Sequence, residues 1–179
     1  ADRMPFLPHA KIEKAILAAG LDYTFLRPAF FFQNLSTTYA RMIRETGEVA
    51  LPVGRARMSW IDSRDIGAAG AIALMGEEHR NKAYTLTEKA YDFDQVAAIF
   101  ARELNRPIRY TRPSVFRYRR LMRSLGAPEG IINLTTMMYV MARLGLSADV
   151  TDDLGRILGR EPLSMAQFVR DYAAVWTPG

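Results

Sequence analysis

Apolar positions near the start of the chain repeat with a helical period and then change to an extended pattern. Four apolar residues follow the i, i+3, i+4, i+7 spacing of one helix face: Ile12, Ala15, Ile16 and Ala19. Gly20 comes next, and glycine ends helices because it adopts the left-handed backbone conformation at little steric cost. Residues 23–28, YTFLRP, then predict a strand that ends at a proline, which cannot donate to a ladder. Helix, stop and strand in this order predict half of an α/β unit.

The same alternation continues in the next forty or so residues. Asn34 or Ser36 is suited to cap a helix that runs to about Arg44, because their side chains accept hydrogen bonds from the exposed amides of a first turn. Gly47 ends this helix. Short strand pieces interrupted by proline and glycine follow over residues 47–62.

Small residues dominate the next helix, over 65–75, which Asp62 or Ser63 is expected to cap. Residues 83–87, AYTLT, predict another strand. Residues 91–105 then form a clear amphipathic pattern. The chain therefore alternates helix and strand, which is typical of α/β folds with a parallel sheet.

The pattern changes after a last predicted strand at 107–113. From Ser114 onward only helical periodicity is seen, over residues 115–125, 128–144 and 164–176. We therefore predict two parts, an α/β part over residues 1–113 and a helical cap over residues 114–179.

Composition restricts the classes of protein. The 179 residues are 49% hydrophobic, which suffices for one domain with a sizeable core. No cysteine is present, and the two histidines, His9 and His79, lack a metal-binding spacing, so no metal site is predicted. No apolar run is long enough to span a bilayer, and the first residues lack the order of a signal peptide. The sequence therefore predicts a soluble, cytoplasmic chain.

The formal net charge is +5, which is compatible with an anionic partner. Arginines concentrate in residues 106–126, on a predicted helix that also carries apolar residues. The sequence favours a solvated helix face there. A nucleic-acid or phosphate-binding patch is the alternative, and nucleic acid is the less favoured partner.

Four separated segments together resemble one protein family. They are HAKIE followed by GLDYTFLRPAFFFQNL, then GRARMSWIDSRDIGAAGAIAL, then YTLTEKAYDFDQVAAIFARELNRPIRY, and finally LGREPLSMAQFVRDYA. In this order they resemble the C-terminal part of the NmrA-like, atypical short-chain dehydrogenase/reductase family. The resemblance implies a fold of the α/β class, the C-terminal part of a Rossmann-like parallel sheet with a helical substrate-binding cap. It also implies NADP or NAD as cofactor.

The nucleotide-binding strands that the resemblance implies are missing from this sequence. No G-x-G-x-x-G or G-x-x-G-x-x-G turn follows a strand, and Gly67 and Gly70 stand in a predicted helix. We therefore expect that the chain is a truncation or a proteolytic remnant. An unpaired strand edge would remain, and such edges favour self-association, so a homo-oligomer is expected.

In proteins similar to this one, the first helix carries a lysine that holds the nicotinamide ribose, four residues before a glutamate. His9 occupies that position here, and Lys11 is an alternative cation. Histidine titrates near neutral pH, so His9 is a candidate acid or base. The structural alternative is that His9 only stands at the start of the helix, where backbone groups or water satisfy its hydrogen bonds. No tyrosine stands four residues before either residue, so the usual Tyr-x-x-x-Lys pair is absent.

An aromatic run with one amide follows the first strand. An apolar wall and an amide at the carboxyl end of a strand suit a flat nicotinamide or quinone ring. The residues predicted to contact the cofactor are Pro28, Phe30, Phe31 and Asn34. The alternative, with equal weight, is that the phenylalanines belong to the core and Asn34 caps the following helix.

Five apolar residues are predicted to contact the substrate. They are Phe32, Met58, Trp60, Met137 and Met141. Core packing is the alternative for each of them, although methionine-rich faces also line adaptable pockets. Arg27, at the end of a buried strand, must be paired, and Asp62 or Asp65 is its expected partner.

These features predict the substrate-binding part of an NAD(P)-dependent oxidoreductase that acts on a small carbonyl or quinone. The alternative is a non-catalytic protein that senses NAD(P) and reports to a partner.

Overall fold

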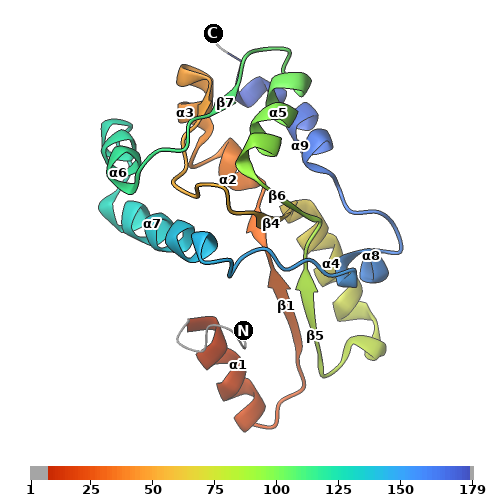
Figure 1. Ribbon diagram of the computed structural model, residues 1–179. Helices are drawn as coiled ribbons and strands as arrows, with labels where there is room; N and C mark the ends of the chain where they lie inside the picture. The colour runs from red at the N-terminus through yellow and green to blue at the C-terminus, as the bar shows by residue number, and fades with distance from the viewer. Residues whose placement is uncertain (1–7, 178–179) are drawn as a thin grey trace.

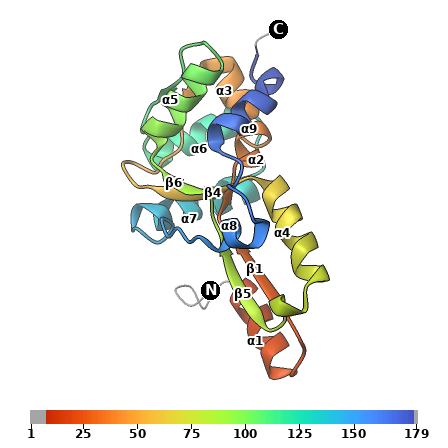
Figure 2. The ribbon, with the colours of Figure 1, turned by 90° about the vertical axis from the view of Figure 1, so that its right-hand side faces the viewer.

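Helices surround a set of short, mostly parallel strands (Figures 1 and 2). The computed structural model describes residues 8–177. The strands are β1 (Thr24–Pro28), β2 (Phe30–Phe31), β3 (Glu48–Val49), β4 (Met58–Ile61), β5 (Lys82–Leu86), β6 (Lys89–Tyr91) and β7 (Arg109–Tyr110). The helices are α1 (Pro8–Ala18), α2 (Gln33–Ser36), α3 (Ala40–Thr46), α4 (Ser63–Met75), α5 (Phe93–Glu103), α6 (Val115–Ser124), α7 (Glu129–Arg143), α8 (Asp153–Leu158) and α9 (Met165–Asp171).

The strand pairs show how the sheet is organised. β1 pairs in parallel with β5, and the ladder passes Pro28 because the Ala29 amide donates to the Leu86 carbonyl at 2.9 Å. β2 then changes partner and pairs in parallel with β4, which in turn pairs antiparallel with β6. β1 and β5 thus diverge where they continue into β2 and β6, and β4 lies between the two continuations. No other described strand pairs with β1.

Two hydrophobic clusters hold the elements together. The main cluster gathers the large aromatic residues of the strands, α5 and the C-terminal segment, with Trp60 and Phe168 fully buried. A second, smaller cluster joins α4, β5 and α8 through Ala69, Leu86 and Leu154. The chain therefore returns after α7 to pack α8 on the α/β part, and α8 and the antiparallel strand β6 are two elements that the sequence pattern missed.

α1 projects from the body beside β1 (Figure 1). Its predicted apolar face is only partly covered by the described residues: Ile12 is 56% exposed, Ile16 is partly buried, and among the side chains described in that helix only Ala10 is buried. Gly20 ends the segment with φ of 65°, as predicted. An ion pair between Glu13 and Arg27, rather than apolar packing, ties the helix to β1.

The helix predicted from Asn34 or Ser36 to Arg44 is wrong, because two helices occupy this stretch. α2 ends at Ser36 and α3 begins at Ala40, and neither has a side-chain cap. Gly47 ends α3 with φ of 63°, as predicted. The last predicted helix also divides, into α9 and a 3-10 turn over Ala173–Val175.

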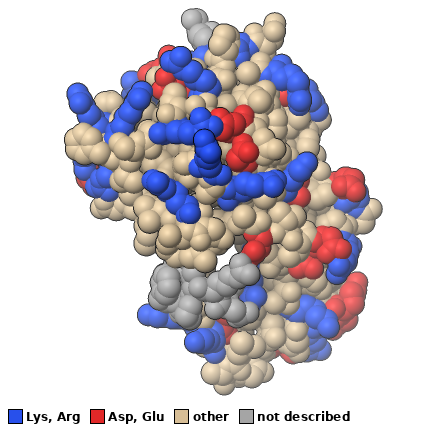
Figure 3. All heavy atoms as spheres, viewed as in Figure 1, with Lys and Arg blue, Asp and Glu red and all other residues tan. Residues whose placement is uncertain are grey.

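The arginines of α6 are largely paired with acidic side chains. Arg119 and Arg123 both contact Glu129, and Arg117 lies 3.9 Å from Glu48. Figure 3 shows many Lys and Arg side chains on the upper part of this face, with a smaller number of Asp and Glu side chains among them. These pairs favour the solvated helix face over a nucleic-acid patch.

Glu88, between β5 and β6, is a largely buried carboxyl group. Its Oε1 accepts a hydrogen bond from the Tyr91 hydroxyl at 3.0 Å, and its Oε2 is buried without a partner. Burial raises the pKa of Glu88 to about 7, with a smaller contribution from the Asp65 carboxylate, against the opposing effects of the Tyr91 hydrogen bond and the Lys89 cation. The charged form is therefore disfavoured in the folded protein.

We expect the free energy of unfolding to depend on this group between about pH 4.5 and 7. Because the folded state binds the proton more tightly, stability falls as pH rises through this range and levels off above about pH 7. Glu88→Gln should remove this fall in stability with pH. It should therefore stabilise the protein by about 1–2 kcal/mol at pH 8 but not at pH 4. Urea unfolding at both values measures this effect. Glu77→Gln, at a 91% exposed side chain, is the control, and equal effects of the two variants would contradict the assignment.

Candidate functional site

The carboxyl ends of the parallel strands carry the predicted aromatic wall. Successive strand residues point to opposite faces, and the first two phenylalanines follow this rule. Phe30 points inward, where its ring meets Trp60 edge-on at 4.8 Å and lies 6.2 Å from Tyr139. Phe31 is 39% exposed. The Phe31 ring is thus accessible to a ligand, whereas the Phe30 ring belongs to the core. The sequence left a ligand-binding wall and core packing open as alternatives, and each of them describes one of the two rings.

Asn34 adds a free amide to the same turn. Its backbone carbonyl accepts from the Tyr39 amide at 3.0 Å. Its side chain makes no hydrogen bond to any residue in the described range, and it is only partly buried. Pro28, also exposed, lies just before the wall. An exposed aromatic ring and an unused amide three residues apart can hold a planar ring with a polar edge.

A salt bridge between Arg27 and Glu13 ties α1, which carries His9, to β1. Arg27, the penultimate residue of β1, donates from Nε to Glu13 Oε1 at 2.9 Å and from Nη2 to Oε2 at 2.6 Å. The predicted pairing of Arg27 with Asp62 or Asp65 is therefore wrong. His9 lies one helical turn before Glu13 on the same face of α1. Since α1 and β1 run in opposite directions (Figure 1), this turn lies toward the carboxyl end of β1.

The charge on Glu13 is stabilised at this position. Its hydrogen bond from Arg27 lowers the pKa of Glu13, against the opposing effect of burial, and the Arg27 and His9 charges lower it further. Glu13 is therefore ionised at neutral pH. His9 and Lys11 are both exposed on α1. His9 thus has a fixed anion one turn away and free access to solvent or a ligand.

The other predicted substrate residues divide between core and surface. Phe32, Met58 and Trp60 are buried in the main cluster, which is the alternative that the sequence left open for them. They support the wall from within. Met137 is 47% exposed and Met141 is partly exposed, both on α7. These two side chains are accessible to an apolar molecule.

Gln33 and Asp62 were not predicted as a pair, yet they join the wall to β4. Gln33 Nε2 donates to Asp62 Oδ1 at 2.8 Å, and the Ser63 amide donates to Gln33 Oε1 at 2.9 Å. Asp62 also caps α4 by accepting from the Arg64 amide at 2.9 Å. Only the cap has a sequence signal. A glutamine inside an apolar segment has none, because its partner lies 29 residues away.

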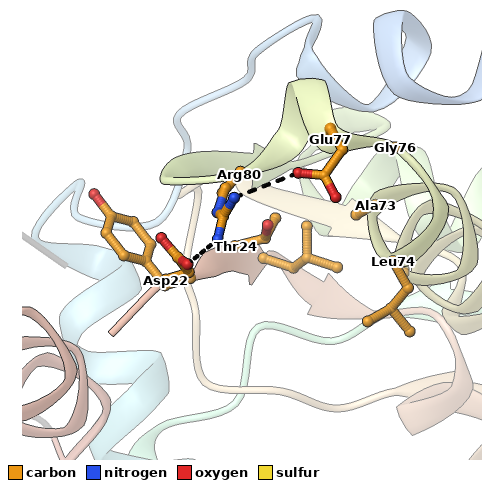
Figure 4. Close-up of a pocket in the computed structure, with 10 residues that line it drawn as sticks. Asp22, Thr24, Ala73, Leu74, Gly76, Glu77 and Arg80 are labelled. Atoms are coloured by element: carbon orange, nitrogen blue, oxygen red, sulfur yellow. Dashed lines mark hydrogen bonds and ion pairs between the residues drawn. The ribbon is translucent and has the colours of Figure 1, made fainter. Parts of the chain in front are cut away.

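A hollow of about 490 Å³ lies elsewhere, between the amino-terminal half of β1 and the end of α4 (Figure 4). Leu26 and Leu74 contribute apolar surface to it. Arg80 reaches between Asp22 and Glu77 at its rim. This hollow includes none of the predicted site residues. In the part of the chain that the structure describes, no cluster of His, Asp or Glu is arranged to hold a metal, and no helix could cross a membrane.

Known proteins resemble this chain in sequence and structure. The NAD(P)H azoreductase of Xenophilus azovorans is 34% identical over 165 residues, which are 92% of this chain and 57% of the azoreductase. The NADPH-dependent quinone oxidoreductase of Escherichia coli, solved with NADPH, superimposes with a TM-score of 0.83 at 24% identity over 91% of this chain and 58% of its own. NmrA, a negative transcriptional regulator solved with NADP, superimposes with a TM-score of 0.68 at 19% identity. This match covers 89% of this chain and 55% of NmrA.

The chain spans between 55% and 57% of the length of three curated relatives that it matches. The structural likenesses show a Rossmann-like α/β fold. Residues 3–157 match the NmrA-like family, which is most of the chain. The chain therefore belongs to the NmrA-like family.

Proposed function

We propose that this chain is the substrate-binding part of an NAD(P)-dependent oxidoreductase that acts on a small carbonyl or quinone. The carrying observation is the exposed Phe31 ring with the Asn34 side-chain amide, which has no hydrogen-bond partner among residues 8–177, at the carboxyl end of β2. Ligands of open α/β sheets bind at this end of the strands. The reductase and oxidoreductase names of the relatives agree with this proposal.

The residues present fit the nicotinamide end of the cofactor. Phe31 offers an apolar face to the ring, and Asn34 offers a donor and an acceptor to a carboxamide. Pro28 and Phe30 flank and support them. No glycine-rich phosphate turn occurs in the 179 residues, so the fit concerns the nicotinamide only. When bound, the nicotinamide supplies the hydride.

This chain contributes orientation and proton delivery. His9, or the neighbouring Lys11, delivers the proton to the reduced carbonyl or quinone oxygen. Met137 and Met141 provide apolar contacts to the substrate from the helical cap, residues 114–179. The α/β part, residues 1–113, holds the wall.

We expect His9→Ala to lower the rate of NADPH-dependent quinone reduction about 100-fold, since a positioned general acid contributes on the order of 10²–10⁴. The assay follows NADPH oxidation with menadione as acceptor, in the protein that contains residues 1–179. The Michaelis constants and the folded fraction are measured in parallel, because a proton donor affects kcat more than binding.

Lys14→Ala, at an exposed position on the same helix, is the matched control. An unchanged kcat in His9→Ala would exclude His9 as the acid. A fall confined to Lys11→Ala would transfer the role to Lys11.

An NAD(P)-sensing regulator is the second candidate. Pro5 and Leu7 stand where a tyrosine would precede His9 and Lys11 by four residues, so the usual acid is absent from this segment. NmrA, which has the same fold, is a regulator. Cofactor binding without turnover of any carbonyl or quinone would support this candidate over the reductase.

A further inference from the structure

The turn that carries Phe31 and Asn34 has little local support. α2 begins directly after Phe32 and has only four residues, without a side-chain cap at its start. Such a helix has no independent stability, because helix nucleation costs more than one turn of hydrogen bonds returns. Its position must therefore be fixed by tertiary contacts.

Gln33 provides such a contact through both atoms of its amide. Its Nε2 donates to the Asp62 carboxylate at 2.8 Å, and its Oε1 accepts from the Ser63 amide at 2.9 Å. One side chain thus satisfies an acceptor at the end of β4 and a donor at the start of α4. Together with the Phe32 amide, which donates to the Ile61 carbonyl at 2.9 Å, it fastens the turn to β4.

Asp62 is held rigidly on its other side. Its side chain is fully buried. Arg64 donates to it from Nε at 3.0 Å and from Nη2 at 2.7 Å, and Arg64 Nη1 donates to Asp171 of α9 at 2.6 Å. The Arg64 guanidinium also lies 5.5 Å from the centre of the Tyr172 ring. The carboxylate that receives Gln33 is therefore anchored to two helices.

We propose that Gln33 is a positioning residue for the nicotinamide wall: clamped by Asp62 and the Ser63 amide, it fixes the turn that presents Phe31 and Asn34. This inference rests on the proposed function for its ligand, but the clamp itself is observable without one. Arg64 extends the clamp to α9, so the C-terminal helix contributes to the order of the wall.

The first test uses the free 179-residue chain and NMR relaxation. In Gln33→Ala, order parameters of the amides of residues 31–34 should fall from about 0.85 to below about 0.6, because the turn loses its fixed partner. Gln95→Ala is the matched control. Gln95 completes a capping box on α5, where its Oε1 accepts from the Asp92 amide at 3.0 Å, so its loss removes a glutamine side-chain hydrogen bond away from the wall.

Gln33→Glu gives a signature that a merely structural role would not show. At pH 7 its carboxylate faces that of Asp62, so it should behave like Gln33→Ala. On acidification toward pH 5 the introduced group becomes protonated first and regains a donor toward Asp62. The order parameters of residues 31–34 should then recover.

The second test places the same variants in a longer protein that contains residues 1–179 and a nucleotide-binding part, titrates it with NADPH and follows the side-chain amide resonances of Asn34. Gln33→Ala should bind about tenfold more weakly than wild type, and Gln95→Ala should bind unchanged. If wild type shows no shift at Asn34, the proposed function fails, while the relaxation test still decides the clamp. If residues 31–34 stay rigid in Gln33→Ala, or if Gln95→Ala loosens them equally, the positioning role is overturned.

Discussion

Asp62→Ala is expected to lower the free energy of unfolding by about 2–4 kcal/mol, since it removes a buried carboxylate that accepts several hydrogen bonds, while the Arg64 side chain that it leaves behind is 38% exposed. The Asp62 side chain is fully buried, and it accepts from the Arg64 side chain, the Arg64 amide and Gln33. Removing it also removes the cap of α4, which alone contributes about 1 kcal/mol. Guanidinium unfolding at pH 7 measures the loss.

The contribution of Asp62 should also depend on pH. Burial raises the pKa of Asp62, but the hydrogen bonds from Arg64 and Gln33 outweigh this, and the pKa lies below its usual value. The stabilisation is therefore complete above about pH 4 and is lost as pH falls through the lower, folded-state pKa.

Asp22→Ala is the matched control for this variant. Asp22 pairs with Arg80 at the surface, where the two side chains are 55% and 58% exposed. Exposed pairs contribute little to stability, because water and salt screen the two charges. Comparable losses in Asp22→Ala and Asp62→Ala would show that burial of the Asp62 carboxylate is not decisive.

Trp176→Ala is expected to cost about 3–5 kcal/mol, because it leaves a large cavity in the main cluster. Trp176 is fully buried, its ring centre lies 4.8 Å from that of Phe100, and its Nε1 donates to the Leu35 carbonyl at 3.0 Å. Through Leu35 it also holds α2, just after the wall. Thermal and urea unfolding measure the loss.

Trp176→Phe separates the two contributions of this residue. It keeps most of the ring packing and removes the hydrogen bond to Leu35, so it should recover more than half of the lost stability. A loss as large as that of alanine would assign the stabilisation to the hydrogen bond rather than to the filled volume.

Local backbone chemistry made much of the fold predictable. Gly20 and Gly47 end their segments in the left-handed conformation, and Asp62 caps α4, as the sequence indicated. Each of these features depends on a residue and its immediate neighbours. α8 and β6 were missed because they are short, and β6 owes its existence to pairing with β4.

The candidate site was predictable only in part, because the packing of separate elements decides which of its side chains are exposed. The aromatic run and Asn34 mark the end of a strand, but the run does not say which ring is exposed. Phe30 faces Trp60 and Tyr139, so the packing of β4 and α7 leaves Phe31 as the accessible ring.

The sequence by itself determined several of the helices, the stops at Gly20 and Gly47, a cap at Asp62 or Ser63 and the resemblance to the NmrA-like family, because these follow from local conformational preference and residue order. The tertiary structure alone decided the partner of Arg27, which is Glu13, and the clamp of Gln33 by Asp62. Both are contacts between polar groups from separate elements. Which charge or amide comes within hydrogen-bond distance depends on how those elements pack, and no spacing along the chain encodes that distance.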